Sequence, residues 1–399
     1  LQYRLVMVHA SLRSVFLILV LWLAGLGAAA QFAKIAIPFS SLRALYPEAG
    51  EELGWLLSLI SLLGVVFGMT AGVIVSRLGC YRLLIFALLL GAAVSLWQAA
   101  LPSLTTMLVS RLIEGVSHLI IVVAAPTLIA QVSATRYRGL AMTLWSTFFG
   151  VSFAVVAWLG LPLTAAYGVN SLFLAHGLFM SAVAGLLIVS STPSGVIQAA
   201  SEVPLRFDMI WQRHMAAYRS PSISAPAIGW LFYTLTFVAL LAILPDLLPA
   251  ETRSLVTGVM PLASIAVALF VVSPLLAVVS ASTIVMAGFL LAAAVLALLI
   301  AGMPLSYACI ALFAVLGLVQ GASFAAVPEL NGTVEAQVLS NGAIAQLGNL
   351  GNTLGTPVLL SLQGQWGLQG LLTTVLAVYV AGCFAHMVLA YLRRVQSTM

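Results

Sequence analysis

Charged residues are scarce in this 399-residue chain. Asp, Glu, Lys and Arg make up 6% of it, whereas 63% of the residues are hydrophobic and the mean hydropathy is +1.18. Soluble domains are about 25% charged and about 45–50% apolar, so the composition excludes a water-soluble globule. Lysine is rarest: Lys34 is the only one, and the remaining basic residues are arginines. The composition indicates an all-α integral membrane protein.

Several kinds of site are also missing from the sequence. The three cysteines, Cys80, Cys309 and Cys383, lie far apart and form no CxxC pair, which argues against a disulfide framework or a zinc site. The net charge is +5, but the arginines flank hydrophobic runs and form no patch, so nucleic acid is not an expected partner. No Ser-His-acid set or P-loop is visible. We therefore predict no enzyme activity, no cofactor and no metal.

The chain contains twelve hydrophobic stretches long enough to cross a bilayer, which takes about 20 residues. A polar interval at 192–221 divides the stretches into six and six. We predict an N-terminal six-helix bundle at 1–191, a cytoplasmic linker at 192–221 and a C-terminal six-helix bundle at 222–399. The predicted spans are 14–38, 53–76, 82–102, 104–133, 138–161, 168–191, 222–248, 254–277, 279–302, 304–327, 337–361 and 367–392.

The arginines between the spans predict the orientation of the chain. With the N-terminus in the cytoplasm, eleven arginines fall in cytoplasmic segments and only Arg43 and Arg253 on the opposite side. Positive charge accumulates on the cytoplasmic side of membrane proteins, so both termini are predicted to be cytoplasmic. The expected location is a bacterial inner membrane.

Three short motifs carry a family resemblance. The loop after the second span reads GVIVSRLGCYR at 72–82. The fourth span contains RLIEG at 111–115, and GLVQG at 317–321 repeats its spacing in the tenth span. Together with two sets of six spans, these motifs resemble the major facilitator superfamily (MFS) of secondary transporters. The resemblance implies two bundles related by a pseudo-two-fold axis, with the first, fourth, seventh and tenth spans lining a central path.

The resemblance also assigns roles to the loop after the second span. Gly72, Arg77, Gly79 and Arg82 match the cytoplasmic motif of the family and are expected to act in gating, while Ser76 stands where the family has an aspartate. The fourth span resembles the family's Arg-x-x-Gln-Gly motif, with Glu in place of Gln. In proton-coupled members the arginine of that motif is associated with proton coupling.

Polar residues inside the fourth span are the first site candidates. Arg111, Glu114 and His118 are spaced i, i+3 and i+7, so they share one helical face. Charge inside a bilayer is costly and is usually functional. We expect Arg111 to hold an anionic group and Glu114 or His118 to accept the coupling proton. The alternatives are a static Arg111–Glu114 ion pair and an interior histidine with satisfied hydrogen bonds.

The first span supplies a second cation. Gln31 and Lys34 lie at i and i+3, and the distance of Lys34 from the cytoplasmic end brings it to the level of Arg111. Two cations at one depth suit a carboxylate-bearing solute. Asp246, near the outer end of the seventh span, is a further candidate partner for Lys34 in gating. The competing interpretation is that Lys34 snorkels to the lipid headgroups.

The C-terminal half offers uncharged candidates. Gln346, Asn349 and Asn352 form a polar stripe on the eleventh span, and Tyr233 and Gln320 lie on the seventh and tenth. These five are predicted to contact the solute, although amides also bind helices together and aromatic residues more often pack than bind ligands. His176 and His386, which have no partner visible in the sequence, are predicted to be structural.

Taken together, the sequence predicts a monomeric, proton-coupled secondary active transporter for a small organic solute, anionic or zwitterionic. It would work by alternating access in the lipid bilayer. One alternative is an MFS exporter of drugs, siderophores or metabolites. The other is a non-transporting sensor or assembly partner on the same fold.

Overall fold

The computed structural model describes residues 2–68, 70–71, 75, 78–134, 138–190 and 207–398, and within those ranges it contains helices and no strand. Eleven of the described helices are long and apolar enough to cross a membrane. The first half comprises α1 (Gln2–Ala36), α2 (Phe39–Leu45), η1 (Pro47–Gly54), α3 (Trp55–Ser58), η2 (Leu59–Ser61), α4 (Leu62–Phe67), α6 (Cys80–Gln98), α7 (Leu104–Val132), α8 (Arg138–Ser146), α9 (Phe148–Val155), η4 (Val156–Gly160), α10 (Leu161–Tyr167) and α11 (Asn170–Val189). The second half comprises α12 (Phe207–Arg219), α13 (Pro221–Leu247), α14 (Ala250–Val267), η5 (Ala268–Val272), α15 (Ser273–Leu275), α16 (Ala281–Ile300), α17 (Leu305–Leu330) and α18 (Val334–Thr398).

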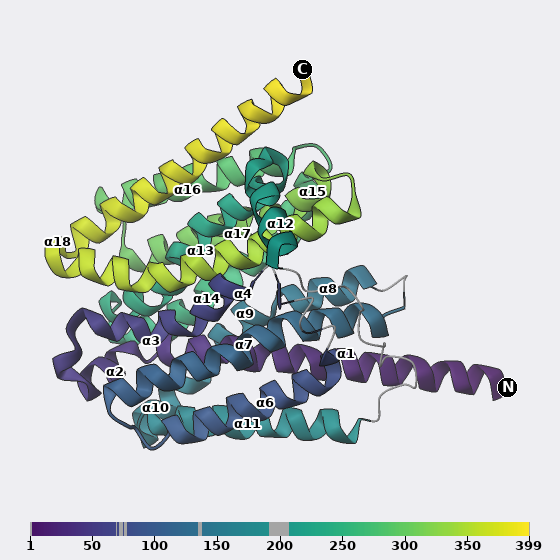
Figure 1. Ribbon diagram of the computed structural model, residues 1–399. Helices are drawn as coiled ribbons and strands as arrows, with labels where there is room; N and C mark the ends of the chain where they lie inside the picture. The colour runs from purple at the N-terminus through teal and green to yellow at the C-terminus, as the bar shows by residue number, and fades with distance from the viewer. Residues whose placement is uncertain are drawn as a thin grey trace.

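The last apolar stretch, Leu339–Gln396, contains two of the predicted spans. It has 58 residues, and a straight helix of that length would run about 87 Å, far more than the roughly 30 Å core of a bilayer. The chain instead reverses at Gly367, whose φ of +65° and ψ of −165° are not helical and suit a residue without a Cβ. This turn at the left of Figure 1 separates the predicted eleventh and twelfth spans.

The fifth span lies later in the chain than predicted. The sequence pattern indicated 138–161, whereas the apolar helix that can cross a membrane is Phe148–Tyr167. The prediction stopped the helix before Pro162. In the structure the helix continues past that proline, and a π-helical segment at Val156–Gly160 lies just before it; such wider turns and prolines are the usual irregularities within a long helix.

The two halves of the chain pack against each other along their length (Figure 1). Segments η1 to α4 lie along α18, and α9 lies along α14. Glycines permit the close approach: a Cβ on Gly64 would lie 2.2 Å from Cγ of Asn349, and one on Gly54 would lie 3.2 Å from Cα of Pro357. The predicted linker at 192–221 stays a prediction, because only its second part, which contains α12, is among the described residues.

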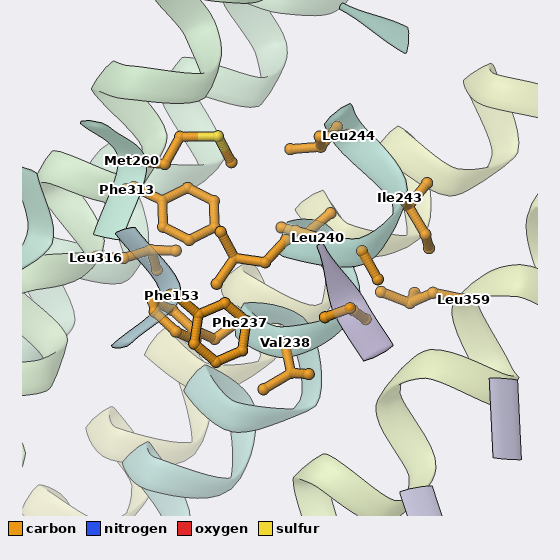
Figure 2. Close-up of a cluster of buried hydrophobic side chains, with 14 of the residues drawn as sticks. Phe153, Phe237, Val238, Leu240, Ile243, Leu244, Met260, Phe313, Leu316 and Leu359 are labelled. Carbon is orange, nitrogen blue, oxygen red and sulfur yellow. The ribbon is translucent and has the colours of Figure 1, made fainter. Parts of the chain in front are cut away.

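Buried apolar side chains divide into clusters that differ in which halves they join. The largest, here called the shared core, takes residues from both halves; its first-half members lie at the end of the bundle where α1 finishes, and its second-half members extend along that half. Figure 2 shows Phe153 of α9 there beside Phe237 and Val238 of α13. Toward the chain termini, a second cluster belongs to the first half alone and a third to the second half alone. Within the described ranges, the shared core is the apolar cluster that joins the two halves, and it does so at the end where α1 finishes.

Candidate functional site

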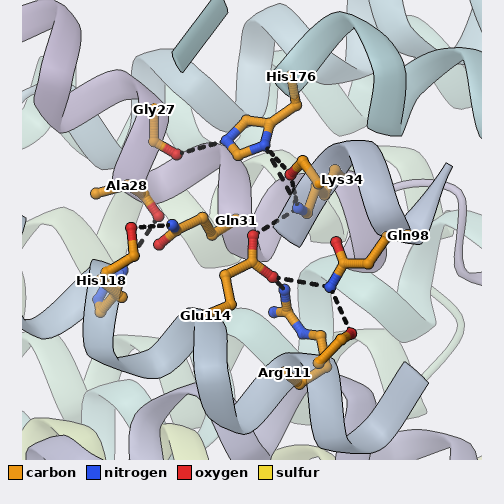
Figure 3. A network of polar contacts seen from close by, with 12 residues as sticks. Gly27, Ala28, Gln31, Lys34, Gln98, Arg111, Glu114, His118 and His176 are labelled. Atoms are coloured by element: carbon orange, nitrogen blue, oxygen red, sulfur yellow. Dashed lines mark hydrogen bonds and ion pairs between the residues drawn. The ribbon is translucent and has the colours of Figure 1, made fainter. Parts of the chain in front are cut away.

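A buried charged centre lies inside the first half. Lys34 occupies the last turn of α1, where a cation is favoured by the helix dipole. Its Nζ is 2.5 Å from Oε1 of Glu114, and Arg111 pairs with Oε2 of the same carboxylate (Figure 3). All three side chains are 0% exposed. The two cations predicted at one depth therefore share one carboxylate, and Lys34 does not snorkel to the membrane surface.

The charged centre holds two positive charges and one negative charge. Removing such groups from water costs several kcal/mol each unless their hydrogen bonds are satisfied. Gln98 donates to Oε2 of Glu114 at 3.1 Å, and Nε of Arg111 donates to the carbonyl of Leu56 at 2.7 Å. The second terminal nitrogen of Arg111, Nη2, is buried and has no acceptor among the described residues. The centre therefore keeps an excess positive charge and one open donor.

Sequence reasoning missed three members of the same network: Gln98, Ser95 and His176, which contacts Lys34. Ser95 of α6 accepts a hydrogen bond from Lys34, and its Oγ is 2.5 Å from Nδ1 of His176 on α11. Nδ1 of His176 is also 3.4 Å from Nζ of Lys34. A histidine predicted to be structural thus contacts the charged centre. The signal was absent because the contact joins residues 142 positions apart in the sequence.

Gln31 and His118 lie beside the charged centre without bonding to it. Gln31 donates to Oγ of Ser117 at 2.9 Å, and Nδ1 of His118 is 3.1 Å from the carbonyl of Ala28. The hydrogen on Nδ1 must point to that carbonyl, which only accepts. His118 therefore binds α1 to α7 in this conformation, as in the alternative interpretation of an interior histidine.

The charged centre is enclosed by helices of the first half and does not line the interface between the halves. We expected Lys34 and Arg111 to face a central path, but the network joins α1, α3, α6, α7 and α11, all of the first half. The enclosure follows from close packing of α6: a Cβ on Gly91 would lie 2.6 Å from Oγ of Ser117 and 2.9 Å from Nε2 of Gln31. Small residues at such positions let helices approach until polar side chains are sealed between them.

The second half has a smaller polar cluster that contains two of the predicted residues. The hydroxyl of Tyr233 donates to Oε1 of Gln320 at 3.2 Å, and Ser264 donates to the same oxygen at 2.8 Å. These side chains come from α13, α17 and α14. The structure thus brings Tyr233 and Gln320 together. Gln320 follows the same motif spacing as Glu114, so a neutral amide stands in the second half where the first half has a carboxylate.

Aromatic rings connect the two halves near these clusters. Tyr233 stacks on Trp230 at 4.7 Å and on Phe237 at 5.0 Å, measured between ring centroids. Phe237 in turn lies 6.2 Å from Phe149 of α9, whose ring is 5.7 Å from Phe32 of α1. Such ring pairs add to the packing energy of the interface. We call these five residues the aromatic row.

The amide stripe of α18 makes contacts between helices. Gln346 donates to the carbonyl of Val65 in α4 at 2.8 Å and accepts from the hydroxyl of Tyr218 in α12 at 2.8 Å. Asn349 donates to a carbonyl of its own helix and abuts Gly64, while Oδ1 of Asn352 is buried with no partner among the described residues. Gln346 thus bonds α12 and α18 to the first half.

The bond between Tyr218 and Gln346 gives a prediction for alkaline pH. Burial raises the pKa of Tyr218 from 10 to about 12, because the phenolate is less well solvated there than in an unfolded chain. The stabilisation by the neutral phenol is complete below pH 10 and is lost as the pH rises through about 12. Tyr218→Phe should lower stability by about 1 kcal/mol at neutral pH. Unfolding can be measured from about pH 9 to about pH 12, a range that includes the ordinary pKa of tyrosine. The free energy of unfolding should fall more steeply with pH in the wild type than in the variant. Equal slopes would contradict the assignment.

Comparison with known proteins identifies the family to which this architecture belongs. The family model of the Major Facilitator Superfamily matches residues 17–356, which is most of the chain. The chain belongs to the major facilitator superfamily. A crystal structure of the human organic anion transporter MFSD10 (TETRAN) is similar over 94% of this chain and 99% of that chain, with a TM-score of 0.68 and 18% sequence identity. At that identity the likeness concerns the fold. A comparison with curated proteins finds no match.

The MFS gating motif is only partly among the described residues. Gly72 and Arg77 lie outside them, so their predicted roles stay predictions. Gly79 has a φ of +91°, which suits glycine at the start of α6, and Arg82 is exposed. Asp246 is half-buried, and the described residues include no ion-pair partner for it. Lys34 pairs with Glu114 instead, so the predicted Lys34–Asp246 pair is absent from this conformation.

Proposed function

We propose that this MFS protein is a proton-coupled secondary transporter for a small organic anion or zwitterion and that it works by alternating access. The observation that carries the proposal is the charged centre, in which Lys34 and Arg111 share one carboxylate and Arg111 keeps a buried open donor. An uncompensated buried cation favours binding of an anion. MFSD10 is an organic anion transporter, and the anion site proposed for this chain agrees with the solutes of that protein.

Alternating access is supported by the distribution of apolar packing. The shared core joins the halves at one end, and separate clusters serve each half at the other. Rocking of the halves would open the shared core and bring the opposite ends together. Rocking alone leaves α1, α6, α7 and α11 together in the first half. The proposal therefore also requires α1 and α7 to shift relative to α6 and α11 within that half, which would open the charged centre to a carboxylate.

Uptake by proteoliposomes tests the proposal. The purified protein is reconstituted and offered radiolabelled lactate, benzoate, succinate and taurine, with and without a transmembrane pH gradient. At least one of these solutes should accumulate, and faster with the gradient. Lys34→Ala should reduce that uptake at least tenfold, since losing a charge-assisted hydrogen bond costs about 1.5–3 kcal/mol.

Arg43→Ala is the matched control, because Arg43 is an exposed cation on α2. It should leave uptake unchanged. Gradient-independent uptake, or equal uptake by Lys34→Ala and wild type, contradicts the proposal.

A second candidate function follows from the aromatic row. Rings that line up between two bundles suit a planar, apolar solute, as expected of an exporter of drugs or other large metabolites. Ethidium efflux from the same proteoliposomes distinguishes the candidates. Efflux that survives Lys34→Ala but falls with Trp230→Ala favours the exporter.

A further inference from the structure

The contact of His176 with the backbone sets the tautomer of its neutral imidazole in this conformation. Its Nε2 is 2.9 Å from the carbonyl oxygen of Gly27. A carbonyl only accepts, so Nε2 carries a hydrogen. Nδ1 is 2.5 Å from Oγ of Ser95, and that hydroxyl already accepts from the ammonium of Lys34. In a neutral imidazole only one ring nitrogen carries a hydrogen, so with Nε2 donating to Gly27 the other nitrogen, Nδ1, accepts the hydroxyl hydrogen of Ser95.

These bonds form a continuous chain from the carboxylate to the imidazole. It runs from Oε1 of Glu114 to Nζ of Lys34, then to Oγ of Ser95 and Nδ1 of His176 (Figure 3). The four members come from α7, α1, α6 and α11. Each link has one donor and one acceptor, so a proton can move along it without rearrangement of heavy atoms.

Glu114 is a poor place for an added proton in this arrangement. Its carboxylate is bonded by Lys34, Arg111 and Gln98, and protonation would leave two buried cations without a counter-charge. His176 can take a proton without breaking an ion pair. Resting on the proposed function, we propose that His176 is the proton-accepting group that couples proton uptake to anion binding in this network.

The proton step balances as follows. The hydroxyl proton of Ser95 moves to Nδ1 of His176, and Ser95 takes a proton from Nζ of Lys34. A hydronium ion from the solvent, admitted when the centre opens, then reprotonates the amine of Lys34 and leaves a water molecule. One proton is added, and it resides on His176 as an imidazolium that still donates from Nε2 to Gly27.

Charge explains why the proton and the anion enter together. The charged groups that face His176 are Lys34 on α1 and Arg111 and Glu114 on α7, which sum to one positive charge, while α6 presents the neutral Ser95. Without an anion, a proton on His176 would raise the excess charge to two. A bound carboxylate offsets one of them. Each ligand therefore strengthens binding of the other, and the linkage is reciprocal.

Proton uptake during binding tests this assignment. Full-length protein in lipid nanodiscs is titrated with benzoate in a calorimeter at about pH 6.5, near the ordinary pKa of histidine. The titration is repeated in buffers of different ionisation enthalpy, so that the heat of binding reports the number of protons taken up. The wild type should take up about one proton per benzoate, as reciprocal linkage requires. His176→Asn, which keeps an acceptor for Ser95 but cannot be protonated, should bind benzoate with no proton uptake. His386→Asn, at a fully buried histidine of α18 in the second half, should behave as the wild type.

The possible outcomes separate the two proposals. If the wild type binds benzoate without proton uptake, or if uptake persists in His176→Asn, the His176 assignment is wrong while anion transport stands. If the wild type binds no panel acid, the proposed function is wrong. Should His176→Asn fail to fold, ¹⁵N NMR of the wild type decides: His176 should be neutral with hydrogen on Nε2 before benzoate and an imidazolium after it. A neutral His176 after benzoate overturns the assignment.

Discussion

Replacing Glu114 by glutamine is expected to destabilise the protein by about 3–5 kcal/mol, because two buried cations lose their common counter-charge. Glutamine has the same shape, so the loss would come from charge and not from a cavity. The measurement is chemical or thermal unfolding in detergent. A change below about 1 kcal/mol, the ordinary value of an exposed ion pair, would mean that water reaches the charged centre in the resting protein.

A double variant and a control sharpen this test. In Glu114→Gln/Lys34→Met one of the two uncompensated cations is removed, so the double variant should be more stable than Glu114→Gln alone. That non-additivity is expected between residues in direct contact. Glu251→Gln changes an exposed carboxylate at the start of α14 and should have little effect on stability.

Replacing Phe237 by alanine is expected to open the end of the molecule that contains the shared core. Phe237 is 5% exposed and packs against Phe149 and Phe153 of the other half. Loss of a buried phenylalanine costs about 3–5 kcal/mol. Much of this cost falls only on the conformation in which the halves touch at this end, so the equilibrium should shift by tenfold or more toward separation.

Spin-label distances measure that shift. Labels at positions 43 and 251 sit on exposed residues of α2 and α14, one in each half, at the end that holds the shared core. Phe237→Ala should add a longer distance that the wild type shows weakly or not at all. Phe324→Ala is the control, since Phe324 is 47% exposed and is not part of the shared core. An unchanged distance distribution in Phe237→Ala would mean that this core does not hold the halves together.

Most of the fold could be predicted because hydrophobic length is a local property. A run of about 20 apolar residues must form a helix to satisfy its backbone in lipid, whatever its neighbours. The reversal near Gly367 was predicted for the same reason, since the stretch was too long for one crossing. The fifth span was misplaced because its helix continues past Pro162, after a π-helical segment that nothing local signals.

The candidate site was predictable only where its members share a helix. Arg111 and Glu114 were grouped correctly because i, i+3 spacing fixes their relative position. Their proximity to Lys34 was inferred from its similar depth in the bilayer, which the rise per residue of a helix gives approximately. Ser95 and His176 were missed, and the enclosure of the network within the first half was not foreseen. Both depend on how closely α6 and α11 pack against α1 and α7.

The sequence by itself determined that the chain spans a membrane in two sets of six helices and that a lone lysine lies at bilayer depth. Those conclusions follow from the cost of exposing apolar surface or charge to the wrong solvent. Only the tertiary structure decided which carboxylate compensates that lysine, which histidine lies at the end of its hydrogen-bond chain, and which helices seal the network. Whether a hydrogen bond forms between two helices depends on differences of a few tenths of an ångström in how closely the helices pack. Those distances are set by side chains far apart in the sequence.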